Sequence, residues 1–247
     1  MKFTTLILAV LLSYGAFAQG FYFEMKMSSN KQPDMGTVKV YAQNGNSRSE
    51  IHLAAMDMDI IALVLSGTPN MVYMLNDKDK TYSEMDASKN SQWKDNATED
   101  YDITVLGKEN VNGYNSTHVK IKRKDSKVEE EEWVSTEVND YASFAMAKTK
   151  FTGRMNLYKA LEAKGVKGFP VRIITSTAGN QAQIDFVKAE KRDNPASLFS
   201  FDGYKKTDNA AMGGATMQEM MKKIQSMTPE QQKAFIEQMK QQNQQSH

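Results

Sequence analysis

The chain has 247 residues and contains no cysteine. The missing thiols exclude a disulfide framework, a thiolate zinc site and a cysteine nucleophile. Lysine and arginine number 31 against 30 aspartate and glutamate residues, so the net charge of +1 provides no overall field that would recruit nucleic acid. With 40% hydrophobic and 25% charged residues, this is an ordinary globular composition, and the chain is long enough to bury a core without metals or disulfides.

Residues 1–18 have the pattern of a secretory signal peptide. Lys2 supplies a charged start, residues 6–12 are apolar, and small residues at Ala16 and Ala18 mark a cleavage point. A membrane-spanning helix needs about 20 apolar residues, and this stretch is shorter. We therefore predict cleavage after Ala18, a soluble mature protein that is periplasmic or secreted, and no integral membrane anchor.

After the signal peptide, apolar and polar residues alternate along residues 21–28, as in a strand with one buried face. The same alternation recurs in residues 38–41, 50–53 and 102–105. Residues 60–65 are almost all apolar, which is typical of a strand covered on both faces. Turn signals such as Asn44-Gly45 and Asn112-Gly113 separate the strands. Because short connections join antiparallel neighbours, the pattern predicts a long antiparallel sheet.

Helical signals are confined to two regions. Residues 140–164 carry apolar residues among helix formers, and Gly165 provides a stop. After Asp208, methionines recur at spacings of three and four, and Thr228-Pro229 with Gln231 forms a capping box. A sheet interrupted by helices is an α+β arrangement. We predict three parts: the signal peptide (1–18), an antiparallel domain (19–208) and a Met/Gln-rich helical tail (209–247).

Two oppositely charged segments follow one another, a basic one at residues 120–124 and an acidic one at residues 129–132. Folding the chain at residues 125–127 would place lysine and arginine opposite glutamate, at about 0.2–1 kcal/mol per pair. A cation site would need the glutamates to converge, but consecutive strand residues point to opposite faces. We therefore predict a hairpin with cross-strand ion pairs rather than a metal site.

No motif assigns a reaction to this chain. His52, His118 and His247 are its three imidazoles, and the two internal ones lie in strands beside charged residues, which favours surface or edge positions. No GxSxG, HExxH, GxGxxG or P-loop string occurs. We expect no enzymatic activity, no cofactor and no tightly bound metal.

Methionine is unusually frequent, with 17 residues. The pairs Met25/Met27 and Met56/Met58 each place two thioethers on one side of a strand, where soft Cu(I) could bind. The alternatives are that methionine fills gaps in the core or lines an adaptable apolar groove. Without histidine or cysteine nearby, packing and groove lining are favoured over copper.

Several short motifs together resemble an exported bacterial family, domain-of-unknown-function family 4412. They are Val72–Leu75 with Lys80–Tyr82, Gly113-Tyr114, Trp133–Ser135 and Lys167–Pro170. The resemblance covers about residues 20–205 in order, and this family is similar to the lipoprotein-carrier (LolA-like) fold. It implies a long antiparallel sheet curled into a half-barrel, with helices across its open side and an apolar cavity between them.

These observations favour a soluble periplasmic protein that binds or carries a lipid or acyl chain within a curved sheet. The carrier role is an analogy from the fold, and a fold does not establish a function. The alternative is a structural or protein-interaction module of the cell envelope whose core is filled by its own side chains, with the C-terminal helices available to an envelope protein. The alternation assigns the following residues to the concave or packed side, where a ligand would bind: Phe23, Met25, Val38, Val40, Ile51, Leu53, Ile103, Val105, Val119, Ile121, Ile173 and Phe186.

Overall fold

The computed structural model describes residues 20–54, 57–87, 101–124, 126, 128–138 and 155–207. Within them, the strands are β1 (Phe21–Ser29), β2 (Gly36–Gln43), β3 (Asn46–Leu53), β4 (Met58–Val64), β5 (Met71–Asn76), β6 (Thr81–Asp86), β7 (Tyr101–Val111), β8 (Tyr114–Arg123), β9 (Glu129–Ser135), β10 (Phe169–Thr177), β11 (Asn180–Lys191) and β12 (Lys205–Lys206). One α-helix, α3 (Met155–Ala163), and one 3₁₀ helix, η3 (Ala196–Phe199), accompany them.

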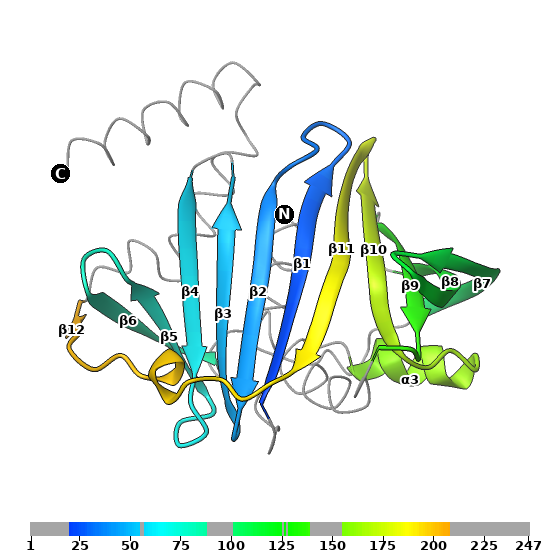
Figure 1. Ribbon diagram of the computed structural model, residues 1–247. Helices are drawn as coiled ribbons and strands as arrows, with labels where there is room; N and C mark the ends of the chain where they lie inside the picture. The colour runs from blue at the N-terminus through cyan, green and yellow to red at the C-terminus, as the bar shows by residue number, and fades with distance from the viewer. Residues whose placement is uncertain are drawn as a thin grey trace.

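All twelve strands belong to one sheet, in the order β12-β6-β5-β4-β3-β2-β1-β11-β10-β9-β8-β7 (Figure 1). The neighbours are antiparallel except β12 and β6, which run parallel. Strands β1 to β6 follow one another in the sheet, each paired with the next in the chain. The chain then crosses to the opposite edge of the sheet, where β7 to β11 are added in turn toward the centre. The last of them, β11, pairs with β1. The predicted long antiparallel sheet is therefore confirmed.

Tight turns form where the sequence predicts them. Asn44 and Gly45 have φ values of 51° and 78° between β2 and β3, and Asn112 and Gly113 have 54° and 84° between β7 and β8. Two consecutive positive φ angles match the right-handed twist of the flanking strands, and asparagine followed by glycine adopts them at low cost. These turns set the register of their hairpins.

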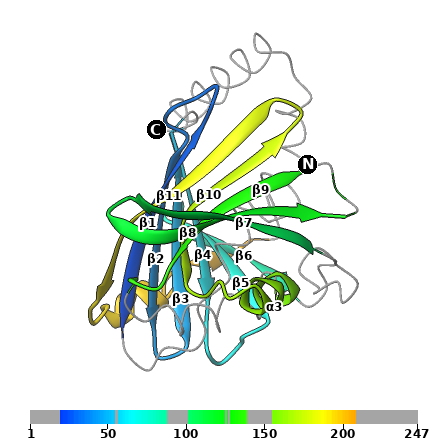
Figure 2. The ribbon, with the colours of Figure 1, turned by 90° about the vertical axis from the view of Figure 1, so that its right-hand side faces the viewer.

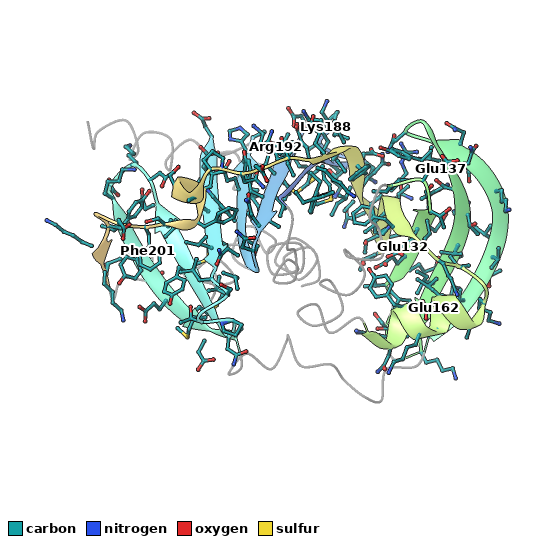
Figure 3. The ribbon with its side chains drawn as sticks, turned by 60° about the horizontal axis from the view of Figure 1, so that its bottom comes forward. Glu132, Glu137, Glu162, Lys188, Arg192 and Phe201 are labelled. Carbon is teal, nitrogen blue, oxygen red and sulfur yellow. The ribbon has the colours of Figure 1, made fainter. Side chains whose placement is uncertain are left out.

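The sheet is strongly curved and does not close. Its end strands, β12 and β7, are not neighbours in the strand order. In the central part β4, β3, β2, β1, β11 and β10 lie side by side, whereas β7, β8 and β9 turn away from them (Figures 1 and 2). Seen from below, both ends of the sheet turn toward the same side (Figure 3). We call the surface on that side the inner face and the opposite surface the outer face.

The described part of the chain is mostly sheet, with fewer helices than the α+β prediction implies. α3 falls inside the first predicted helical region, and Gly165 with a φ of 76° follows it as the predicted stop. The rest of that region up to residue 154, the signal peptide and the whole predicted tail (209–247) lie outside the described residues. The helical tail and the domain boundaries therefore stay predictions. Within the described residues no helix is long and apolar enough to cross a membrane.

The inner face holds the main core, because the two-residue period of each strand places its apolar residues on that side. Cross-strand pairing aligns them in rows that run from β11 through β1, β2 and β3 to β4. One such row is Phe186, Met25, Val38, Ile51 and Ile60. All five side chains are buried in one continuous apolar cluster.

β4 is apolar on both faces, as predicted, because the C-terminal part of the domain covers its outer side. Residues 192–207, which we call the strap, run across β4, β5 and β6 and end in β12 (Figures 1 and 3). Phe199, Phe201 and Tyr204 of the strap pack against an outer-face cluster that contains Ile61 and Leu63. The sequence does not predict this strap.

Candidate ligand-binding face

α3 packs on one end of the inner face. Leu157 and Leu161 are four residues apart and therefore lie on the same side of the helix. They are buried against apolar residues of β7, β8 and β9, the three strands at one edge of the sheet. These residues are Ile103, Val119, Ile121 and Val134. Among the described helices, α3 is the one that packs on this face, and its contacts lie at the end formed by β7, β8 and β9.

The structure buries eleven of the twelve side chains that the sequence assigns to the ligand side. The main inner-face cluster contains Phe23, Met25, Val38, Val40, Ile51, Leu53 and Phe186. The α3 cluster contains Ile103, Val119 and Ile121. Ile173 on β10 is buried as well. The structure therefore places these residues on the packed side, while their role in binding a ligand stays a prediction.

Val105 does not follow this prediction, because 46% of its surface is exposed. It lies on β7, the last strand of the sheet, which has a strand neighbour on one side only. The register between β7 and β8 shifts between Val105 and Gly107, and Leu106 at this irregularity is 50% exposed. A bulge on an edge strand displaces side chains from the regular alternation. The alternation in the sequence does not reveal that irregularity.

The predicted hairpin of β8 and β9 forms, and its ion pairs lie on the outer face. Lys120 and Lys122 each lie 2.7 Å from a carboxylate oxygen of Glu129. These two hydrogen bonds lower the pKa of Glu129 to about 2. Because the charges neutralise one another locally, the segment is a structural hairpin, as predicted.

Glu132 is a charged inner-face residue that the sequence analysis did not assign to this side. It pairs with Val119 on β8 and Ile173 on β10, and its exposed fraction is 0%. Figure 3 shows its side chain directed toward the interior of the curved sheet. Alternation counted along β9 could have found it, since every second residue of a strand faces the same side. The four consecutive glutamates obscured that count.

His118 belongs to a cluster of aromatic and charged side chains on the outer face. Its ring stacks on Trp133, with ring centroids 4.0 Å apart. Nδ1 lies 2.9 Å from Oε1 of Glu109, and Nε2 lies 2.8 Å from Oε2 of Glu131. Trp133 Nε1 also donates to Glu109, at 2.7 Å. These contacts join β7, β8 and β9. The charged neighbours are present as predicted, but the His118 side chain is only 17% exposed and β8 has a neighbour on each side, so the predicted surface or edge position is wrong for His118.

A second polar network fastens the turn between β7 and β8 to the central strands. Asn112 Nδ2 donates to the backbone oxygen of Val171 at 3.0 Å and to Asp185 at 2.9 Å. Burial opposes the ionisation of Asp185, but hydrogen bonds from Asn112, Gln183 and Arg172 outweigh it and hold its pKa below the usual value. This network holds the turned-away part of the sheet in place.

The metal hypotheses receive no support from the described residues. In that part of the chain, no group of three or more histidine, aspartate or glutamate residues is arranged to hold a metal ion. Met25, Met27 and Met58 are buried in the inner-face cluster. Met56 lies outside the described residues, so the second methionine pair is not described in full. The three described members of the two pairs pack as apolar side chains, which fits both core packing and groove lining.

Comparisons with solved structures find matches at low identity and with TM-scores below 0.5. An uncharacterized conserved protein from Thermus thermophilus is 8% identical with a TM-score of 0.47, over 77% of this chain and 91% of that chain. Lipoprotein LppX from Mycobacterium tuberculosis is 11% identical with a TM-score of 0.40, over 77% and 93%. A LolA superfamily protein from Nitrosomonas europaea is 13% identical with a TM-score of 0.34, over 79% and 97%.

No curated protein matches the chain. A family model described as a domain of unknown function, DUF4412, matches residues 21–203, which include every strand from β1 to β11 and most of the strap. The match covers well over half of the chain, and the motifs on which the resemblance rests all lie within it. The chain therefore belongs to the DUF4412 family.

Proposed function

We propose that the protein binds an apolar ligand, a lipid or an acyl chain, against the inner face of its sheet, in the periplasm or outside the cell. The observation that carries this proposal is the continuous apolar surface of that face. It extends from β11 to β5, and its large side chains include Phe23, Met27 and Ile51. The described helix α3 packs only at the other end of the face. Such a surface must be covered by an apolar layer.

The two faces of the central strands differ, which supports the choice of the inner one. On the outer side of β1, β2 and β3 lie charged and polar residues, including Glu24, Lys39 and Glu50. Arg192 lies over the ring of Tyr22, with 4.0 Å between the guanidinium carbon and the ring centroid. An alkyl chain would gain nothing from these charges, so a ligand would be confined to the inner face.

An acyl chain provides enough free energy for reversible binding. Burial gains about 0.8 kcal/mol per CH₂, so about twelve buried groups would gain about 10 kcal/mol. Association costs several kcal/mol in lost motion, which leaves an affinity suited to carriage rather than permanent capture. No covalent step is needed, and we propose that the protein is not an enzyme.

The second candidate is a structural or protein-interaction module of the envelope. One observation favours it: Phe23, Val40 and Ile51 have exposed fractions of 0%. If residues of the chain itself supply the apolar layer in the mature protein, no surface is left for a ligand. The two candidates differ in whether a bound apolar molecule is required to cover the inner face.

Lipid extraction and probe binding test the proposal on the mature chain, residues 19–247. Mass spectrometry of the purified protein is expected to detect a bound lipid, and a fluorescent acyl probe is expected to bind. Val40→Glu places a carboxylate on the inner face and is expected to abolish probe binding. Val105→Glu is the matched control, because Val105 is exposed, and it is expected to leave binding unchanged.

Thermal unfolding of both variants separates the candidates. Lost binding in a folded Val40→Glu variant supports the ligand-binding role. If Val40→Glu unfolds, the nearly isosteric Val40→Thr variant replaces it and is expected to weaken binding in a folded protein. A wild-type protein that carries no lipid and binds no probe would reject the proposal in favour of the module.

A further inference from the structure

Strand β7 forms one edge of the sheet, and within the described residues no strand pairs with its free side. It is eleven residues long, and most of its residues are exposed. Val105 and Leu106 are two of the three large apolar residues that are exposed in the described part of the chain. An open edge strand presents a row of backbone N–H and C=O groups with which another strand can pair.

The opposite edge of the sheet is built differently. There the short strand β12, which consists of Lys205 and Lys206, pairs with Thr81 and Tyr82 of β6. A very short edge strand with lysine side chains discourages pairing with a further strand. β7 is long, and its sequence contains no proline. The edge that is open to pairing is therefore that of β7.

An irregularity limits the part of β7 that can pair. The register with β8 shifts between Val105 and Gly107. Beyond the shift, Glu109 is already in contact with His118 and Trp133 on the outer face. Because a bulge disrupts the ladder locally, the regular part of the strand is the segment before it, residues 101–105.

The two sides of this segment differ in polarity. Ile103 and Val105 pair with apolar inner-face residues of β8, so Tyr101, two positions earlier, lies on the same side. Asp102 and Thr104 alternate with them on the outer side, and both are exposed. The segment is therefore apolar on one side and polar on the other.

We propose that two copies of the chain associate through antiparallel pairing of residues 101–105 of β7, centred on Ile103. In this register the two Ile103 residues lie opposite each other, and Tyr101 of each copy lies opposite Val105 of the other. An aromatic residue opposite a β-branched one is a favourable cross-strand pair. The pairing also covers Val105, which is otherwise exposed.

The outer side of the segment fits the same register. Asp102 of each copy lies opposite Thr104 of the other, whose hydroxyl can donate a hydrogen bond to the carboxylate. Centring the pair on Asp102 would instead place two carboxylates opposite each other, and centring it on Thr104 would bring Asp102 opposite Leu106 at the irregularity. The segment thus complements itself, which favours a second copy over a strand of another protein as the partner of this edge.

Sedimentation velocity on the mature chain, residues 19–247, tests the association. One short strand pair is a small contact, so we expect a weak, reversible dimer that is mostly monomeric at about 1 µM and mostly dimeric at about 500 µM. A protein that stays monomeric over this range would overturn the inference. That result would leave the proposed function standing, because ligand binding concerns the inner face.

Charge substitutions test the register. Thr104→Asp sets carboxylates opposite each other at both ends of the pair, and it is expected to raise the Kd of the dimer at least about tenfold, which corresponds to about 1.4 kcal/mol. Adding Asp102→Lys to Thr104→Asp restores opposite charges and is expected to return the Kd to within about threefold of the wild-type value. Thr37→Asp makes the same change on the outer side of the central strand β2, and it is the matched control that should keep the wild-type Kd.

Circular dichroism and thermal unfolding verify that each variant is folded. A Kd that Thr104→Asp leaves unchanged would refute pairing through β7, and a dimer that the double variant does not restore would refute the register. If Thr104→Asp does not fold, Thr104→Lys carries the test. A lysine at this position faces Asp102 of the second copy, so it is expected to lower the Kd about threefold, and an unchanged Kd would refute the inference.

Discussion

The strap depends on one buried amide, and removing it should destabilise the whole domain. Asn194 is buried where the strap leaves the end of β11, and its Nδ2 donates to the backbone oxygens of Phe21 at 2.9 Å and Ala42 at 3.1 Å. These oxygens belong to the paired strands β1 and β2. Asn194→Ala therefore removes both donors from carbonyl groups that water cannot easily reach.

The expected loss follows from those two bonds. Each hydrogen bond contributes about 1 kcal/mol net, and a buried acceptor without a donor costs more, so the substitution should cost about 2–3 kcal/mol. For a chain of this length the midpoint of thermal unfolding changes by about 2–4 °C per kcal/mol, which predicts a decrease of about 4–12 °C. Asn194→Asp should be at least as harmful, because a carboxylate would face two carbonyl oxygens.

Thermal and urea unfolding of purified variants measure the effect. Asp193→Ala is the control, because Asp193 is exposed and adjacent, and it should change stability by less than about 0.5 kcal/mol. If the midpoint of thermal unfolding of Asn194→Ala lies within about 1 °C of that of the control, the amide does not anchor the strap and the reasoning is wrong.

Three further predictions concern the outer face and the export signal. Phe201→Ala removes a ring whose centroid lies 4.7 Å from that of Tyr73, and it should cost about 2 kcal/mol in urea unfolding, partly restored in Phe201→Leu. The pKa of Glu129, about 2 in the folded chain, lies below its ordinary value, so its stabilisation is complete above about pH 4.5 and is lost as the pH falls toward 2. Urea midpoints measured from pH 5 to 2 should therefore fall less steeply in Glu129→Gln than in the wild type. N-terminal sequencing of the exported protein should begin at Gln19, and a membrane-bound product that retains Met1 would contradict cleavage after Ala18.

The sequence predicts the local parts of this fold well, because they depend on short-range chemistry. Alternation identifies strands such as β1 and β2, and the Asn44-Gly45 pair fixes the turn of the next hairpin. Antiparallel order within a series of hairpins then follows from short connections. The burial of β4 on both of its faces is also predicted, by the run of apolar residues in its second half.

Long-range features could not be predicted in the same way. The pairing of β11 with β1 joins Ala182 to Ser29, and nothing in either segment encodes that partner. The strap is equally hidden, because Phe199 and Phe201 lie in a segment without a regular period. At the candidate site, the rows of apolar residues follow from alternation. The exposure of Val105 does not, because it depends on the irregular pairing of β7 and on the position of β7 at the edge of the sheet. The burial of Glu132 depends on strands far away in the sequence.

The two ends of the sheet are protected on opposite faces, and this arrangement bears on function. At the β4–β6 end the strap covers the outer face, where Ile61, Leu63 and Tyr73 would otherwise contact water. At the β7–β9 end α3 covers the inner face. Each covering element packs on the apolar residues of the strands beneath it. The inner face of the central strands is a third apolar surface of the sheet, and it is the one on which we propose that a ligand binds.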